Sequence, residues 1–128
     1  MRFIAILIAA LALTASLSQA VGPDNVTSTQ AQALLAKQKS MFVLDVRTPD
    51  EYRQARLKGA LLVPLGELNR RVREIPRDRP VLVYCAVGAR SATAASFLAS
   101  RGYREVYNMT DGIVGWYRNG LPLQFGAR

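Results

Sequence analysis

The sequence of 128 residues contains no histidine and only one cysteine, Cys85. Without histidine, the chain cannot use a Ser-His-Asp triad, a Cys-His pair or a histidine-bound metal. A single cysteine excludes a disulfide within the chain and a zinc site made of cysteines. The nine glycines and six prolines follow no period, which excludes collagen-like and low-complexity chains. With 50% hydrophobic and 20% charged residues, the composition is typical of one globular domain.

The first twenty residues have the pattern of a secretory signal peptide. Arg2 is followed by an unbroken apolar run over residues 3–13, and Ser18 and Ala20 supply the small residues that signal peptidase recognises. The apolar run is shorter than the roughly 17–25 residues that a membrane-spanning helix needs, although an uncleaved membrane anchor is the alternative. We therefore expect residues 1–20 to be a signal peptide, residues 21–128 to form the mature domain, and the protein to be periplasmic without a stable membrane span.

The formal net charge of +8 raises the question of a nucleic-acid partner, and removal of Arg2 lowers it by one. Five arginines cluster between residues 70 and 79. Acidic residues interrupt this cluster, and no aromatic residue lies within it to stack on bases. We interpret it as a solvated helix face and expect no nucleic-acid partner.

Short apolar runs alternate with helical patterns along the rest of the chain. The runs predict strands over residues 41–46, 60–64, 81–84 and 105–107. Helices are predicted over residues 31–36, 65–75, 89–101 and 113–119. Thr27 and Gln30 have capping-box spacing before the first of these helices. A further helix is predicted after Thr48, where Pro49 suits the first helical position and Glu51 completes a second capping box. This alternation predicts an α/β fold with a parallel sheet of four to five strands and helices on both faces.

Cys85 lies directly between a predicted buried strand, residues 81–84, and a predicted helix, residues 89–101. Ligands of parallel α/β sheets bind at the carboxyl ends of the strands, where Cys85 is expected. The positive end of the following helix and the permanent charge of Arg90 both favour an anion at this point. These features favour the thiolate of Cys85 over the thiol. The alternative is that Cys85 is a small buried hydrophobe.

The residues after Cys85 have the composition of an anion-binding loop. Gly88 permits the positive φ that a tight loop needs. The small side chains of Ala86 and Ala89 leave the backbone amides open, so several N–H groups can point inward as an anion-binding nest.

Three segments of the chain together resemble the rhodanese family, in particular its single-domain exported members. They are residues 44–52 with residues 59–60 and 63–65 behind them, residues 85–91, and residues 112–122. The resemblance extends over residues 27–123 and implies a rhodanese-like fold. It also implies a thiosulfate sulfurtransferase, in which the loop cysteine takes a sulfane sulfur from thiosulfate or a similar donor and passes it to cyanide or a thiol.

The resemblance also implies a role for each residue of the loop. Cys85 is expected to be the nucleophile that carries the sulfur as a persulfide. The persulfide and the oxygens of the donor are expected to be bound by the residues that follow it, which are Ala86, Val87, Gly88, Ala89 and Arg90. The expected partners are a small anionic sulfur donor and a thiol or cyanide acceptor, and no metal or organic cofactor is implied.

Two alternatives to this activity come from the same loop. Four residues separate Cys85 from Arg90, whereas related phosphatases have five, so a phosphatase or arsenate reductase is disfavoured. The second alternative is a persulfide carrier that delivers sulfur to a protein partner, with little turnover of small molecules. The side chains at positions 86, 87 and 89 are uncharged, whereas family members that favour thiosulfate often have a basic side chain there. The sequence therefore leaves the identity of the sulfur donor open.

Further residues of the three segments have structural or functional interpretations. Asp45 and Arg47 either support the loop directly or form a structural ion pair at the end of a strand, and we favour the ion pair. Ser91 directly follows Arg90 and is expected to support the loop. Trp116 either belongs to the core or contacts substrate, and we favour the core. Asp111 stands where the family frequently has glycine, and residues 55–58 differ from the family's usual Gly-His-Ile-Pro.

Overall fold

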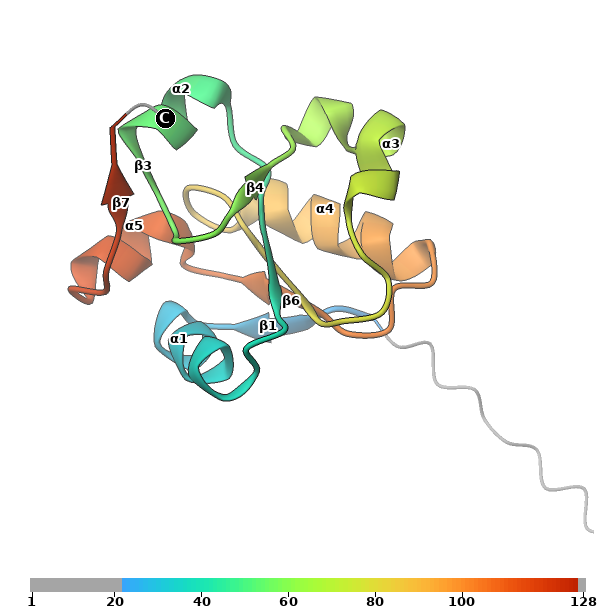
Figure 1. Ribbon diagram of the computed structural model, residues 1–128, viewed down its shortest axis with the longest axis horizontal. Coiled ribbons are helices and arrows are strands. Elements are labelled where there is room, and N and C mark those ends of the chain that lie inside the picture. Colours follow the sequence, from blue (N-terminus) through green and yellow to red (C-terminus); the bar gives the residue numbers. More distant parts are fainter. Residues whose placement is uncertain (1–21, 127–128) are drawn as a thin grey trace, which may run out of the picture.

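A five-stranded parallel sheet forms the centre of the protein (Figure 1). The computed structural model describes residues 22–126, so the predicted signal peptide lies outside the described residues. The strand order is β1-β6-β5-β2-β4, and the strands are β1 (Asp24–Val26), β6 (Val106–Met109), β5 (Val81–Tyr84), β2 (Phe42–Asp45) and β4 (Leu61–Leu62). All neighbouring pairs in this sheet are parallel, which confirms the predicted α/β class and the predicted number of strands.

Helices follow the strands, as the alternation predicts. They are α1 (Ser28–Lys37), α2 (Pro49–Gln54), α3 (Leu68–Arg71), α4 (Ala89–Ser100) and α5 (Gly112–Arg118). Both predicted capping boxes are present: the side chains of Thr27 and Thr48 accept from the backbone N–H groups of Gln30 and Glu51. Each box satisfies donors that a helix start otherwise leaves unpaired. Within residues 22–126, no helix is long and apolar enough to cross a membrane.

The single helix predicted over residues 65–75 is wrong. This segment is divided into η1 (Leu65–Glu67), α3 and η2 (Val72–Glu74), of which η1 and η2 are 3₁₀ helices. Its apolar residues come in pairs three positions apart, such as Val72 and Ile75, and a 3₁₀ helix with three residues per turn aligns such pairs equally well. Gly66 further lowers the preference for a continuous α-helix.

Three strands have no clear signal in the sequence. β1 contains a single apolar residue, Val26, and lies at the edge of the sheet beside β6. β3 (Ala55–Arg56) and β7 (Gln124–Phe125) pair in antiparallel orientation and form a separate ribbon beside α5 (Figure 1). These strands have two or three residues each, which is too short for an alternating pattern to emerge.

The two faces of the sheet carry two separate cores. In β5, Val81 and Val83 belong to the cluster that contains Leu98 of α4. Leu82 and Tyr84 belong to the opposite cluster, with residues of α1 and α5. The alternation follows from the two-residue period of a strand, and it confirms helices on both faces. Because β5 is buried throughout, its end at Tyr84 holds Cys85 in a fixed position.

The core of the second face contains Trp116, whose side chain is buried as expected. Its indole N–H donates a hydrogen bond of 2.9 Å to the backbone oxygen of Pro122. This bond holds the segment between α5 and β7 against the core.

Candidate functional site

Cys85 lies at the carboxyl end of β5, in the short loop that leads into α4, and is 1% exposed. Gly88 ends this loop with φ of +96°, which confirms the positive φ that we predicted. A Cβ atom at Gly88 would lie 2.2 Å from the backbone oxygen of Thr110. Both the dihedral angle and the close approach therefore require glycine here.

The loop points its hydrogen-bond donors at the sulfur of Cys85. Sγ accepts hydrogen bonds from the backbone N–H groups of Gly88 at 3.1 Å and Ser91 at 3.3 Å. The Ser91 hydroxyl lies 3.3 Å from the same sulfur. Burial raises the pKa of Cys85, but the hydrogen bonds from Ser91, Gly88 and Val87 together outweigh it, so the pKa is lowered below its ordinary value. These donors stabilise the thiolate more than the surroundings of an ordinary cysteine do, and no general base takes part.

The first turn of α5 supports the loop from the other side. The N–H of Ile113 donates to the Cys85 oxygen at 2.9 Å, and the N–H of Val114 donates to the Ala86 oxygen at 3.1 Å. Gly112 approaches so closely that a Cβ atom there would lie 2.1 Å from the Ala86 oxygen. Our sequence reasoning missed this support, although Gly112 begins the third segment of the resemblance.

Asp111, where the resemblance frequently implies glycine, has a role within the fold. Its carboxylate accepts from the backbone N–H of Ser28 at 2.8 Å and from the Ser28 hydroxyl at 2.7 Å. Asp111 therefore connects the start of α5 with the start of α1, where a negative charge is favourable.

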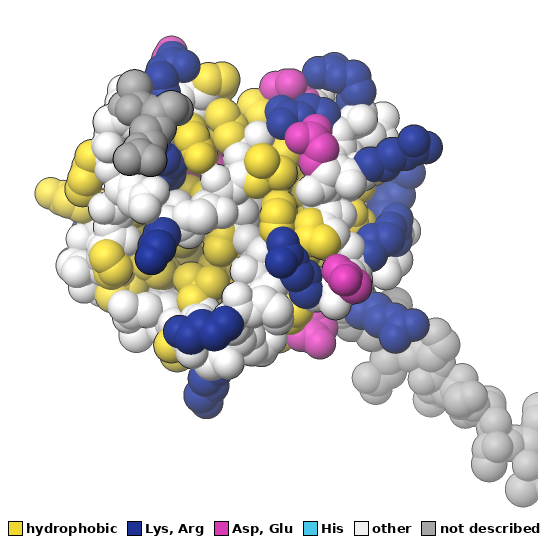
Figure 2. Space-filling model, viewed as in Figure 1, with side chains coloured by type: hydrophobic (Ala, Val, Ile, Leu, Met, Phe, Trp, Pro, Cys, Tyr) yellow, Lys and Arg dark blue, Asp and Glu magenta, His cyan; other side chains and the backbone are white. Residues whose placement is uncertain are grey.

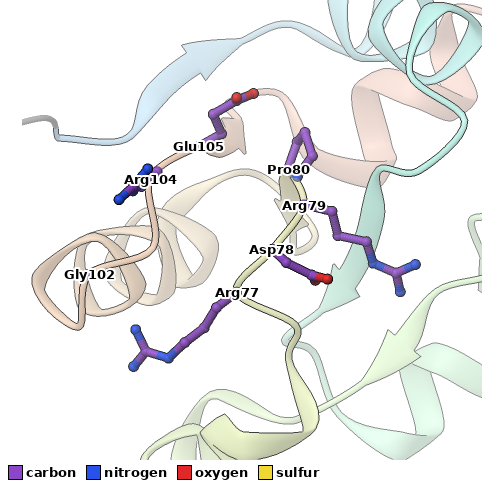
Figure 3. A pocket seen from close by; sticks show the side chains of 7 residues that line it. All are labelled: Arg77, Asp78, Arg79, Pro80, Gly102, Arg104 and Glu105. Carbon is purple, nitrogen blue, oxygen red and sulfur yellow. The ribbon is translucent and has the colours of Figure 1, made fainter.

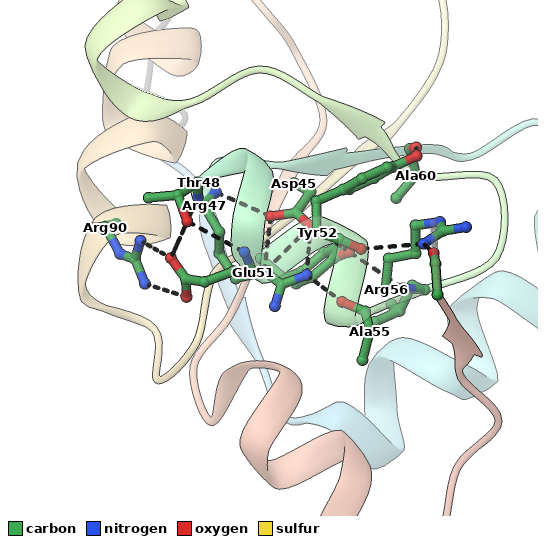
Figure 4. A network of polar contacts seen from close by, with 12 residues as sticks. Asp45, Arg47, Thr48, Glu51, Tyr52, Ala55, Arg56, Ala60 and Arg90 are labelled. Atoms are coloured by element: carbon green, nitrogen blue, oxygen red, sulfur yellow. Dashed lines mark hydrogen bonds and ion pairs between the residues drawn. The ribbon is translucent and has the colours of Figure 1, made fainter. Parts of the chain in front are cut away.

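Arg90 lies at the rim of the loop, and its guanidinium is paired with Glu51 (Figure 4). The two hydrogen bonds, from Nη1 to Oε1 and from Nη2 to Oε2, measure 2.8 and 3.0 Å. They lower the pKa of Glu51 to about 2, against the opposing effect of burial and with further help from Thr48. The sequence pattern placed Glu51 only in the capping box and gave no sign of this pairing, because 39 residues separate Glu51 from Arg90.

Asp45 and Arg47 form a buried ion pair beside the loop. Nη2 of Arg47 lies 2.7 Å from Oδ2 of Asp45 and donates to the Ala55 oxygen at 2.6 Å. The Tyr84 hydroxyl donates to the same Asp45 oxygen at 2.8 Å. Burial, reinforced by the charge of Asp45, raises the pKa of Tyr84. The pair fixes the residue before Cys85, in agreement with the structural interpretation that we favour.

The surface next to the loop is apolar. A hollow of about 280 Å³ lies there, with a lining of Arg47, Ala55, Ile113, Val114, Tyr117, Arg118, Leu123 and Phe125. Within residues 22–126, three large hydrophobic side chains are exposed, and they are Val87, Tyr117 and Phe125. Figure 2 shows hydrophobic surface over the region of α5 and β7. The loop therefore opens beside a surface that suits an apolar group.

Several arginines of the cluster of residues 70–79 have partners within the domain. Arg71 forms a salt bridge with Glu74, and Arg77 donates to the Arg101 oxygen at 2.6 Å while it stacks on Tyr103. A hollow of about 450 Å³ borders this cluster (Figure 3), with a lining of Arg77, Asp78, Arg79, Pro80, Gly102, Arg104 and Glu105. Since Pro80 precedes β5, this hollow lies at the opposite end of the strand from Cys85.

Comparison with known proteins finds a matching family model and relatives of similar sequence. Residues 27–119 match the family model of the rhodanese-like domain. A sulfurtransferase from Allochromatium vinosum is 38% identical over 100 residues, which cover 78% of this chain and 94% of the relative. The thiosulfate sulfurtransferase GlpE from Vibrio cholerae is 33% identical over 94 residues, which cover 73% of this chain and 88% of the relative.

Solved structures have the same architecture. A rhodanese-related protein from Thermoplasma volcanium is 30% identical, with a TM-score of 0.72 over 79% of this chain and 97% of that chain. A thiosulfate sulfurtransferase from Pseudomonas aeruginosa is 31% identical, with a TM-score of 0.73 over 82% of this chain and 21% of that chain.

Proposed function

The chain belongs to the family of rhodanese-like domains, and from this premise we propose that it is a thiosulfate sulfurtransferase that carries sulfur as a persulfide on Cys85. The donor is thiosulfate or a similar anion with a sulfane sulfur, and the acceptor is cyanide or a thiol. The signal-peptide pattern of residues 1–20 supports the periplasm as the place of action.

The reaction consists of two displacements at sulfur. The Cys85 thiolate attacks the sulfane sulfur of thiosulfate, the new S–S bond forms, and sulfite leaves with the electron pair of the old bond. Cyanide then attacks the outer sulfur of the persulfide, thiocyanate leaves, and the Cys85 thiolate is restored. Neither step needs a proton from a side chain, which suits a chain without histidine.

The single observation that carries this proposal is the set of donors around the Cys85 sulfur. Backbone N–H groups of Gly88 and Ser91 and the Ser91 hydroxyl all lie within 3.3 Å of Sγ. Donors in this position stabilise negative charge on sulfur, whether it is the attacking thiolate or the sulfur displaced when the persulfide is discharged. We assign the backbone amides of residues 86–90 to the donor's oxygens and to the persulfide.

Steady-state formation of thiocyanate from thiosulfate and cyanide tests the proposal. The wild type is expected to turn over many times, and Cys85→Ser is expected to have no activity while it retains the circular dichroism spectrum of the wild type. Ser100→Ala, in the last turn of α4, is a matched control that should be fully active. Thiocyanate formation by Cys85→Ser at the wild-type rate would disprove the proposed mechanism.

The exposed apolar side chains beside the loop favour a second candidate, a persulfide carrier for a protein partner. Val87, Tyr117 and Phe125 are 63–67% exposed, and exposed hydrophobic groups of this size often mark protein contacts. A carrier would load once with thiosulfate and discharge slowly to cyanide. Single-turnover loading without repeated thiocyanate formation would therefore favour the carrier over the enzyme.

A further inference from the structure

Arg90 is the only basic side chain in the loop of residues 85–90, and its charge is already matched by Glu51. The two hydrogen bonds of 2.8 and 3.0 Å join both guanidinium Nη atoms to both carboxylate oxygens. The side chains of residues 86–89, between Cys85 and Arg90, are uncharged. The rim of the Cys85 site therefore has one positive and one negative charge, with no net charge from this pair.

Glu51 is fixed in place by its own helix. It is the third residue of α2, and Oε1 accepts from the Thr48 N–H at 3.3 Å and lies 3.1 Å from the Thr48 hydroxyl. The capping box thus holds the carboxylate near the loop independently of Arg90. Glu51 remains charged throughout the neutral pH range, because its pKa is about 2.

We propose that Glu51 determines the donor selectivity of the Cys85 site by neutralising Arg90, so that doubly charged donors are disfavoured relative to singly charged donors. This inference rests on the proposed sulfur transfer. Glu51 acts as a positioning residue, since it contacts Arg90 and not the reacting sulfur. The physical reason is that the attraction between an arginine and a dianion is twice that between an arginine and a monoanion at the same distance. Neutralisation of Arg90 therefore removes more attraction for a doubly charged donor than for a singly charged one.

Two donors of nearly the same shape provide the test. Thiosulfate carries two negative charges, and methanethiosulfonate carries one, because a methyl group replaces an oxygen. Both transfer one sulfane sulfur to the Cys85 thiolate, and the leaving groups are sulfite and methanesulfinate. The quantity of interest is the ratio of kcat/KM for thiosulfate to kcat/KM for methanethiosulfonate, with cyanide as the acceptor in both assays.

Glu51→Gln removes the charge but keeps an oxygen that can accept from the Thr48 N–H. We expect this variant to raise the selectivity ratio about fivefold, through a lower KM for thiosulfate at similar kcat, because partly exposed charges contribute modestly. The increase should shrink at high salt, because salt screens partly exposed charges. Glu74→Gln is the matched control: it removes the same charge from a carboxylate that pairs with Arg71, and its ratio should equal that of the wild type.

Substitution of Arg90 shows whether Glu51 acts through it. Arg90→Gln leaves the negative charge of Glu51 alone at the rim, so the selectivity ratio should fall below that of the wild type. The double variant Glu51→Gln with Arg90→Gln has no charge at either position, and its ratio should return to the wild-type value. Such a cycle isolates the coupling between two residues in contact.

Several outcomes would overturn the inference. An equal change of kcat/KM for both donors in Glu51→Gln would show a purely structural role for Glu51. A raised ratio that persists in the double variant would show that Glu51 does not act through Arg90. If the wild type transferred sulfur from neither donor, the proposed function itself would fail, and the inference would fail with it.

Discussion

At the scale of single residues, Cys85 is subject to two opposing effects. Burial favours the neutral thiol, and the hydrogen bonds from Ser91 and Gly88 favour the thiolate and prevail. A lowered pKa means that the thiolate fraction rises with pH through a range below that of an ordinary cysteine, and that reactivity falls when the pH drops through the lowered pKa. Ser91 contributes to this balance with both its hydroxyl and its backbone N–H.

Ser91→Ala removes the hydroxyl and keeps the backbone N–H. We expect the pKa of Cys85 to rise, so that alkylation by iodoacetamide at neutral pH becomes slower, by roughly three- to tenfold. The pH dependence of the alkylation rate measures this pKa directly. Ser100→Ala, at the far end of α4, should leave the profile unchanged. A profile of Ser91→Ala that coincides with the wild type would show that the hydroxyl does not support the thiolate.

Gly88→Ala tests the backbone of the loop. The substitution places a Cβ atom at a positive φ and 2.2 Å from the Thr110 oxygen, so we expect a loss of about 1–3 kcal/mol in the free energy of unfolding. Gly59→Ala is a control with the same kind of φ but no atom within 4 Å. Urea denaturation measures both variants. Equal losses in the two would show that the close approach to Thr110 contributes nothing.

At the scale of secondary-structure elements, a buried ion pair fixes the carboxyl end of β2. Asp45 is fully buried and pairs with Arg47, and the same carboxylate holds the Tyr84 hydroxyl of β5. The pair thereby joins β2 to the strand that carries Cys85. A buried ion pair of this kind need not add stability, but removal of one partner leaves an uncompensated charge in the interior.

Asp45→Ala should therefore lower the free energy of unfolding strongly, by about 3–5 kcal/mol in urea denaturation. The reason is that it leaves the buried guanidinium of Arg47 without its counter-ion. Asp50→Ala removes an exposed carboxylate that pairs with Arg53, and it should cost at most about 1 kcal/mol. A small loss in Asp45→Ala would mean that Arg47 finds other partners.

The contact between α2 and α4 makes stability depend on pH. The pKa of Glu51 falls from its usual 4.5 to about 2 in the folded protein, chiefly through hydrogen bonds from Arg90. This contribution is complete above the usual value and is lost as the pH falls from there toward the lowered value. We expect the wild type to lose more stability than Glu51→Gln over this range in urea denaturation. Parallel losses in the two proteins would contradict the pairing.

The sequence predicted the elements with strong local signals and missed those that depend on distant contacts. Buried β5 and the capping boxes of Thr27 and Thr48 follow from neighbouring residues, and so does the position of Cys85. The ribbon of β3 and β7 joins segments about seventy residues apart, and no short window contains its pairing.

Within the candidate site, too, some features follow from neighbouring residues and others depend on distant contacts. The loop glycine and the donors around Cys85 are adjacent in sequence, so their role could be anticipated. The pairing of Arg90 with Glu51 and the support from Gly112 depend on how the chain folds back on itself. Both alter the interpretation of the loop, because Glu51 neutralises the charge of Arg90 and the close approach of Gly112 holds the loop backbone.

At the scale of the whole molecule, the architecture brings three distant segments to one end of the sheet. The loop after β5, the cap of α2 and the first turn of α5 meet around Cys85, and the exposed apolar side chains lie beside them. Arg77, Arg79 and the hollow that they line lie at the opposite end. The domain therefore has one end equipped for chemistry at sulfur.

The decisive measurement for sulfur transfer through Cys85 is the intact mass of the purified protein before and after incubation with thiosulfate. We expect a gain of one sulfur atom, which cyanide removes and which Cys85→Ser does not show. No gain in the wild type, with Cys85 alkylated as slowly as an ordinary thiol, would mean that the loop neither stabilises a reactive thiolate nor carries sulfur.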